Sequence, residues 1–134
     1  MIKPLASLAL IALFTHVTPS YAREVRVYSG RHYNTDREVF KSFSEKTGIK
    51  VRLIEATGIS LVERLKREGS KSKADVILLV DAARINNAAM AGLLRPIQSN
   101  QLEKEIPSLY RDPKDRWFGL TRRVRAIIVN PNIV

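Results

Sequence analysis

Residues 75–81 read DVILLVD, which is a run of five aliphatic residues between two aspartates. An apolar run with no alternating polar position is typical of a parallel β-strand that is covered on both faces. Asp81 stands where the N-cap residue of a helix is expected. The apolar residues Ile85, Ala88 and Ala89 then follow at helical spacing. The stretch therefore predicts a buried strand followed directly by a helix.

The same order of strand and helix occurs at the start of the chain. Residues 25–28 (VRVY) are β-branched or aromatic apart from one arginine, which favours a short strand. Thr35 and Glu38 have the spacing of a capping box, which predicts that a helix begins there. Gly48 lies where that helix is expected to end in a left-handed conformation.

A further strand and helix are predicted between these two units. Residues 49–54 (IKVRLI) alternate between apolar and basic positions, as a strand with one wetter face does. Ser60 and Glu63 repeat the capping-box spacing, and Gly69 is expected to end the helix. Three strand–helix units in series predict an α/β fold with an open, mostly parallel sheet and flanking helices.

The last third of the chain gives weaker signals. Residues 97–116 are polar and rich in turn-forming residues, with Asp112-Pro113 as the clearest break. Trp117-Phe118 and residues 124–129 (VRAIIV) are predicted to form two closing strands. In open parallel sheets the ligand crevice lies beyond the carboxyl ends of the strands. The candidate site therefore lies among three loops: residues 29–35, 55–60 and 81–84.

Residues 1–22 have the pattern of a secretory signal peptide. Lys3 precedes the mostly apolar run 5–14, which is too short to span a bilayer because a spanning helix needs about 20 residues. Residues 20–22 (SYA) fit the small-x-small pattern of a cleavage site. We expect cleavage after residue 22, export to the periplasm, and a single domain over residues 23–134.

The composition argues against an enzyme. The chain has no cysteine, which excludes cysteine nucleophiles, thiolate metal sites and disulfides. Residues 23–134 contain a single histidine, His32, and they lack both a G-x-S-x-G motif and a glycine-rich phosphate loop. Asp75 and Asp81 are expected at opposite ends of one strand, which makes them a poor acid–base pair.

The chain is strongly basic, with 23 Lys and Arg against 13 Asp and Glu and a formal net charge of +10. Such a charge suits nucleic acid. The basic residues are spread along the chain, however, and the cluster of Arg122, Arg123 and Arg125 has no interleaved aromatic residues for base stacking. A solvated basic surface is the simpler interpretation, so no nucleic-acid partner is expected. A basic anion- or nucleic-acid-binding module remains an alternative.

The dipeptide His32-Tyr33 stands in the first candidate loop. Imidazole and phenolate are nitrogen and oxygen ligands, and phenolate suits highly charged iron better than it suits soft metals. The helix predicted to follow would add the positive potential of its N-terminus, which favours an anionic ligand. On its own the dipeptide is a weak signal. A tyrosine packed at the sheet edge beside a solvated histidine is the simpler interpretation of these two residues.

A longer stretch around this dipeptide resembles the periplasmic ferric-iron-binding proteins of ABC importers. Members of that family begin with a strand, a turn of pattern YS-x-RHY-x-TD and a helix, and residues 28–36 here read YSGRHYNTD. The resemblance covers nearly all of residues 23–134. It continues in order through residues 46–51, 74–82, 91–94, 111–113 and 117–121.

The resemblance implies the two-lobed type II fold of periplasmic binding proteins, which closes on iron(III) and catalyses no reaction. By position, Tyr33 matches the family's first-lobe phenolate ligand, and His32 matches a histidine that is a ligand in some members. Arg123 matches an arginine near the metal, where a fixed positive charge would offset surplus phenolate charge. The implied partner is the inner-membrane permease of an ABC transporter. A receptor of the same fold for another anionic or metal-chelate ligand is the alternative.

The chain departs from this family in its extent. The family's other tyrosine ligands come from the second lobe. Tyr110 is not expected to replace them, because it lies in the polar segment 97–116. Residues 23–134 therefore resemble an incomplete first lobe, from a truncated gene or a partial sequence. We expect this portion to bind iron weakly or not at all by itself.

Overall fold

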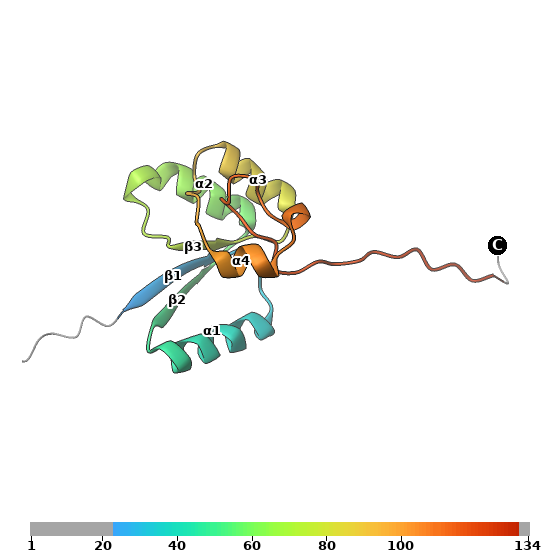
Figure 1. Ribbon diagram of the computed structural model, residues 1–134, viewed down its shortest axis with the longest axis horizontal. Coiled ribbons are helices and arrows are strands. Elements are labelled where there is room, and N and C mark those ends of the chain that lie inside the picture. The colour runs from blue at the N-terminus through green and yellow to red at the C-terminus, as the bar shows by residue number, and fades with distance from the viewer. Residues whose placement is uncertain (1–22, 132–134) are drawn as a thin grey trace, which may run out of the picture.

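The computed structural model describes residues 23–131, so the predicted signal peptide lies outside the described residues. The chain forms three strands and four helices in that range (Figure 1). In chain order they are β1 (Glu24–Ser29), α1 (Asn34–Thr47), β2 (Lys50–Glu55), α2 (Gly58–Glu68), β3 (Val76–Leu78), α3 (Ala82–Met90) and α4 (Asn100–Glu105). Short 3-10 turns follow α2 (Gly69–Lys71) and α4 (Ser108–Tyr110).

β1 is the central strand of a parallel sheet with strand order β2-β1-β3. In the register of this sheet, Val27 of β1 is aligned with Leu53 of β2 and Val76 of β3. The central position explains why Val27, Tyr28 and Ser29 are all buried. Helix α1 lies on one side of the sheet and helices α2 and α3 lie on the other (Figure 1). The predicted fold class, an open parallel α/β sheet with flanking helices, is confirmed.

The best-packed core lies between the sheet and α2. Tyr28 and Leu61 are each 1% exposed, and Leu65 packs beside them. Successive side chains of a strand point to opposite faces, so Tyr28 enters this core while Val27 faces α1. Leu61 and Leu65 lie one turn apart and form the apolar stripe of α2. Partly buried side chains complete the cluster: Ile54, Ala56, Ala74, Ile77 and Leu93.

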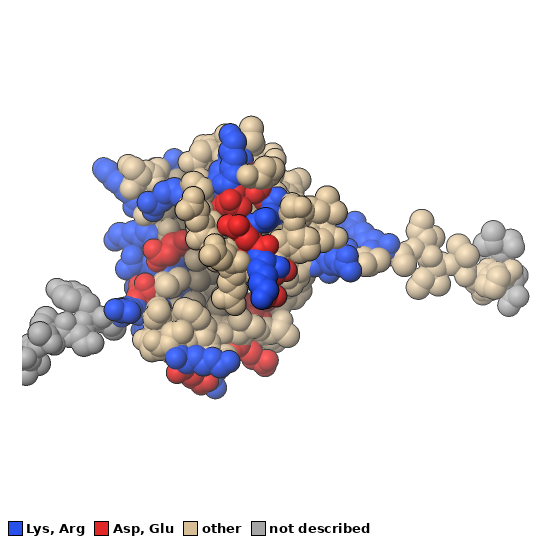
Figure 2. Space-filling model, viewed as in Figure 1, with Lys and Arg blue, Asp and Glu red and all other residues tan. Residues whose placement is uncertain are grey.

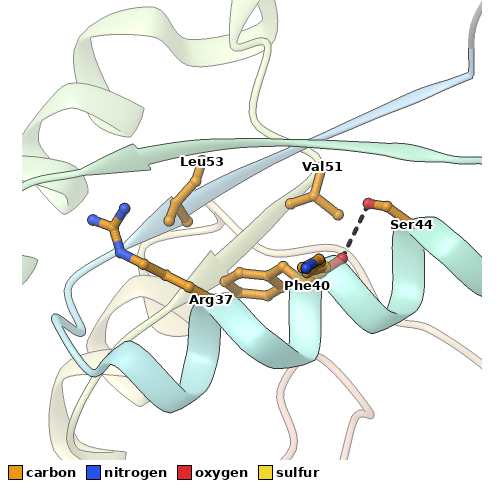
Figure 3. Close-up of a pocket in the computed structure, with 6 residues that line it drawn as sticks. Arg37, Phe40, Ser44, Val51 and Leu53 are labelled. Atoms are coloured by element: carbon orange, nitrogen blue, oxygen red, sulfur yellow. Dashed lines mark hydrogen bonds between the residues drawn. The ribbon is translucent and has the colours of Figure 1, made fainter.

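Helix α1 packs more loosely on the opposite face. None of its residues is fully buried, and the apolar side chains of Val39 and Phe43 are 64% and 39% exposed. Phe40 points toward β2, where it lines a shallow groove of about 230 Å³ together with Val51 and Leu53 (Figure 3). The described part of the chain therefore covers this face of the sheet only in part.

Three predicted helix boundaries are confirmed. Gly48 has a φ of 69°, and its N–H donates to the carbonyl of Ser44 at 2.9 Å, which ends α1 in the left-handed conformation expected of glycine. Gly69 follows the last residue of α2. Asp81 caps α3, because its Oδ1 accepts a hydrogen bond from the N–H of Arg84 at 2.7 Å.

The predicted starts of α1 and α2 are wrong, because both helices begin earlier. In α1, Tyr33 occupies the N-cap position without a side-chain cap, and Thr35 lies inside the first turn. In α2, Thr57 is the cap, and its Oγ1 accepts from the N–H of Ser60 at 3.2 Å. The N–H of Ala56 still bonds to the carbonyl of Ser29 in β1, so α2 begins within two residues of the sheet.

The strand predicted from residues 75–81 is shorter than expected and is not covered on both faces. β3 comprises three residues, and Val76 and Val80 are 42% and 47% exposed. Val76 is in register with Val27 and so points to the same face as α1. Helix α1 packs mainly against β2, and Val76 on that side of β3 remains 42% exposed.

The two predicted closing strands do not form among the described residues. Phe118 makes one isolated antiparallel bridge with Arg111, and residues 121–130 have no regular secondary structure. That segment projects away from the rest of the molecule (Figure 1), and Ile127 is 95% exposed. A strand needs a neighbour for its backbone hydrogen bonds, and the described part of the chain supplies none here. The turn-rich pattern of residues 97–116 also failed to predict α4.

Within residues 23–131, none of the helices combines the length and the apolar character that a membrane crossing requires.

Candidate metal site

The carboxyl ends of the three strands meet at one edge of the sheet, as predicted. The N–H of Ala56 donates to the carbonyl of Ser29 at 3.2 Å, and the N–H of Gly30 donates to the carbonyl of Leu78 at 2.8 Å. A Cβ on Gly30 would lie 3.1 Å from the Cα of Gly58, so the first two loops touch through backbone. These contacts bring the loops after β1, β2 and β3 together.

The loop after β1 is fixed at its base by Ser29. This side chain is 1% exposed, and its Oγ accepts from the N–H of Arg31 at 3.1 Å while donating to the Arg31 carbonyl at 3.0 Å. Such a turn locks the backbone through local hydrogen bonds. It sets the direction in which the chain leaves the sheet toward His32 and Tyr33.

Tyr33 lies directly before α1 with an extended backbone, at φ −90° and ψ 131°. Its carbonyl accepts from the N–H of Asp36 at 3.1 Å, which begins the helix. The side chain is 51% exposed, so the phenol is accessible to a ligand. The N-terminal turn of α1 adds positive potential beside it. The structure therefore does not place Tyr33 as a packed side chain at the sheet edge.

His32 is exposed beside Tyr33. Within residues 23–131, no group of three or more histidine, cysteine, aspartate or glutamate side chains is arranged to hold a metal ion. The candidate ligands at this edge of the sheet are therefore one phenol and one imidazole from the same loop. Two such side chains fill a minority of the positions around a ferric ion.

Arg31 is the residue at this site that sequence reasoning missed. Its guanidinium carbon lies 5.1 Å from the centre of the Tyr33 ring, within the range of a cation–π contact. Its Nε and one terminal nitrogen donate to the two oxygens of Asp36 at 2.8 and 3.1 Å. Its other terminal nitrogen donates to Oγ1 of Thr121 at 3.2 Å. The sequence did offer one signal of this contact: the oppositely charged residues Arg31 and Asp36 stand on either side of Tyr33.

Arg123 is not joined to the candidate ligands by any hydrogen bond, ion pair or ring contact among the described residues. It lies exposed in the extended segment after Thr121. Thr121, at the start of this segment, contacts the loop after β1 because its Oγ1 accepts a hydrogen bond from Arg31. Tyr110 contacts the same segment, because its hydroxyl accepts from Arg122 at 3.2 Å and its carbonyl accepts from the N–H of Gly119 at 2.7 Å. Tyr110 thus packs against residues 119–122.

The groove under α1 is separate from this site. It is lined by Arg37, Phe40, Lys41, Ser44, Val51 and Leu53 (Figure 3). Arg37 forms an ion pair with Glu55, and Ser44 donates its hydroxyl to the carbonyl of Phe40 at 3.0 Å. The polar groups along it are thus engaged within the protein, and no candidate ligand lines it.

The basic residues do not form one continuous patch on the visible face. Lysine and arginine side chains lie in separate groups there, with acidic side chains between them (Figure 2). Many arginines are paired, including Arg64 with Glu68 and Arg116 with Asp112. Pairing of this kind lowers the local positive potential that a phosphate backbone would meet.

The parallel α/β fold, with three loops gathered at the carboxyl edge of the sheet, agrees with the family comparison. The model for the bacterial extracellular solute-binding proteins matches residues 29–134. The chain belongs to this family. This match confirms that the expected resemblance, to the ferric-iron-binding proteins of ABC importers, lies within the right family of solute-binding proteins.

Similar relatives have names that refer to iron. Iron uptake protein A1 of Synechocystis sp. is 48% identical over 113 residues, which are 84% of this chain and 31% of that protein. The major ferric iron-binding protein of Neisseria gonorrhoeae is 32% identical over 123 residues, or 89% of this chain and 36% of that protein. A solved structure of Trichodesmium IdiA (FutA) with iron and citrate has a TM-score of 0.69 at 49% identity, covering 72% of this chain and 30% of that one. The chain thus spans about a third of the length of these relatives.

Proposed function

We propose that the chain is part of an iron(III)-binding solute receptor of an ABC importer, with ferric iron as the cargo and no catalysed reaction. The observation that carries the proposal is the exposed Tyr33 phenol, held beside His32 at the N-terminus of α1 and at the carboxyl edge of the sheet. The names of the similar relatives, which refer to iron uptake and ferric iron binding, support the same cargo.

The chemistry of these two side chains suits a ferric ion. Phenolate is a hard anionic ligand, and iron(III) is a small cation of high charge that prefers such ligands. The metal itself supplies most of the drive to displace the phenol proton. Tyr33 would therefore be a direct ligand, and His32 an additional nitrogen ligand from the same loop. Arg123 would act outside the ligand set by offsetting negative charge when the segment after Thr121 approaches the metal.

The setting of the protein follows from the proposed role. Export through the predicted signal peptide at residues 1–22 would place the receptor in the periplasm, where it would deliver iron to an inner-membrane permease. Tyr33 and His32 leave most positions around iron unfilled, so tight binding requires ligands from outside residues 23–131. The described lobe then contributes one side of the binding cleft.

The proposal is tested by titrating the protein with ferric nitrilotriacetate, a chelate that supplies the remaining ligands. Tyrosinate bound to iron(III) gives a visible charge-transfer band. A receptor for another anionic ligand, or a nucleic-acid-binding module, would give no such band with its own ligand. We expect this band with the parent protein and its loss in Tyr33→Phe, with at least about tenfold weaker binding. Tyr110→Phe is the matched control, because Tyr110 is also partly exposed but lies against residues 119–122. A band that survives in Tyr33→Phe would contradict the assignment.

A further inference from the structure

Arg31 links three separate parts of the molecule at the candidate site. It holds Asp36 in the first turn of α1 through two hydrogen bonds, at 2.8 and 3.1 Å. It reaches Thr121, ninety positions along the chain, at 3.2 Å. Its guanidinium also lies 5.1 Å from the centre of the Tyr33 ring. The side chains of Arg31 and Asp36 are only 20% and 19% exposed, so this pair is well shielded from solvent.

The Tyr33 side chain is not part of the buried core. It is 51% exposed, and Tyr33 makes no side-chain cap for α1. An exposed aromatic side chain ordinarily changes rotamer on a picosecond to nanosecond timescale. A planar guanidinium fixed at both of its edges offers the ring a flat surface in a defined place. Among the described residues, the cation–π contact with Arg31 is therefore a contact that can orient the ring.

We propose that Arg31 is a positioning residue for Tyr33, orienting the phenol toward the binding cleft and coupling it to the segment that carries Thr121. Its consequence for iron binding rests on the function proposed above, whereas its effect on the Tyr33 ring does not. Arg31 acts through geometry. Arg31 uses three guanidinium nitrogens, two for Asp36 and one for Thr121. A lysine ammonium group has the same charge but a single nitrogen, so it cannot make these contacts together.

The first test measures the Tyr33 ring directly by NMR in protein with labelled tyrosines, whose Tyr33 signals are assigned from Tyr33→Phe. We expect Arg31→Ala and Arg31→Lys to move the Tyr33 ring signals toward those of a solvated tyrosine by a similar amount. Thr121→Val should produce a smaller shift in the same direction. The buried Tyr28 ring reports on the fold and should be unchanged.

Arg37→Ala is the matched control for the NMR test. Arg37 of α1 forms an ion pair with Glu55 at the end of β2. Among residues 23–131, no hydrogen bond, ion pair or ring contact joins Arg37 to Tyr33. Unchanged Tyr33 signals in Arg31→Ala, or an equal shift in Arg37→Ala, would overturn the proposal. Tyr33 ring signals that are the same in Arg31→Lys as in the parent protein would overturn the geometric role, because the positive charge alone would then be sufficient. If Arg31→Ala fails to fold, Thr121→Val decides the question, because an unshifted Tyr33 ring in that variant contradicts the coupling.

The second test repeats the ferric nitrilotriacetate titration with the same variants. We expect Arg31→Ala and Arg31→Lys to bind at least about tenfold more weakly than the parent protein, with a charge-transfer band at a changed wavelength. Arg37→Ala should match the parent. Parent-like affinity and band in both Arg31 variants would overturn the positioning role. If the parent itself gives no band, the assignment of Tyr33 as an iron ligand in this chain is wrong, and the NMR comparison still decides the role of Arg31.

Discussion

Asp112 and Arg116 form a two-pronged ion pair that fastens the segment after α4 to the end of α3. Arg116 donates from Nε and from a terminal nitrogen to the two oxygens of Asp112 at 2.6 and 3.0 Å, and its other terminal nitrogen donates to the carbonyl of Ala89 at 3.0 Å. Asp112 is 2% exposed. The segment from residue 112 to residue 116 therefore depends on a charged carboxylate.

This pair predicts a loss of stability in acid. The hydrogen bonds from Arg116 hold the pKa of the Asp112 carboxyl below its usual value, although burial opposes them. A lowered pKa contributes stability that is fully present above about pH 4, the ordinary value for aspartate, and is lost as the pH falls through the lowered pKa. We expect Asp112→Asn to lower the unfolding temperature near neutral pH and to flatten its decrease in acid. Thermal unfolding followed by circular dichroism between pH 3 and pH 7 measures both.

Asp115→Asn is the control for the acid experiment. Asp115 lies in the same turn with a left-handed φ of 53°, which asparagine tolerates, and its ion pair with Arg111 is long at 3.7 Å. Its unfolding temperature should follow the parent protein across the pH range. An acid profile of Asp112→Asn that superimposes on the parent would contradict the role of the pair.

The core between the sheet and α2 makes a second prediction. Leu61 is 1% exposed and packs with Tyr28 and Leu65, so Leu61→Ala removes three buried carbon atoms and leaves a cavity. We expect a loss of about 3 kcal/mol in the free energy of unfolding, measured by urea denaturation. Ile59→Ala on the same helix is the control: Ile59 is 64% exposed and should change stability by less than about 0.5 kcal/mol. Equal effects of the two variants would argue against this core.

A third prediction concerns competition for iron. The described residues offer one phenol and one imidazole from a single loop, and closure by a facing lobe would add ligands and exclude water. Without that closure, we expect excess citrate to remove the metal from the 134-residue chain, seen as complete loss of the visible band. A monomeric chain that keeps iron(III) against excess citrate would refute this and would require ligands other than Tyr33 and His32.

A fourth prediction concerns association between copies of the 134-residue chain. The segment 121–130 exposes Val124, Ile127 and Ile128 by 82%, 95% and 92%, and the sheet ends at the short strand β3. Exposed apolar strand-like segments and uncovered sheet edges pair with other chains. We expect the mass measured by light scattering to rise with protein concentration. The rise should disappear in the double variant Ile127→Lys with Ile128→Lys, whereas a strictly monomeric parent would contradict the prediction.

Local sequence patterns predicted much of the fold because their causes are local. Gly48 ends α1, since only glycine adopts the left-handed conformation there without strain, and Asp81 caps α3 with its own side chain. The alternation of residues 49–54 identified β2, whose side chains from Lys50 to Leu53 alternate between exposed and partly buried positions. The sequence also located the candidate ligands His32 and Tyr33 in the loop after β1, because the order of strands and helices places that loop at the carboxyl edge of the sheet.

Tertiary structure decided the features that depend on distant partners. The closing strands predicted at residues 117–118 and 124–129 have suitable residues, but strand formation requires a neighbouring strand, and the described chain provides none. Thr57 rather than Ser60 caps α2, and it directly follows Ala56, whose N–H still bonds to β1. Arg31, which lies against the Tyr33 ring, also donates to Thr121 ninety positions away. The residue types at the site follow from the sequence by itself, whereas the orientation of their side chains arises from contacts that exist only once the chain has folded.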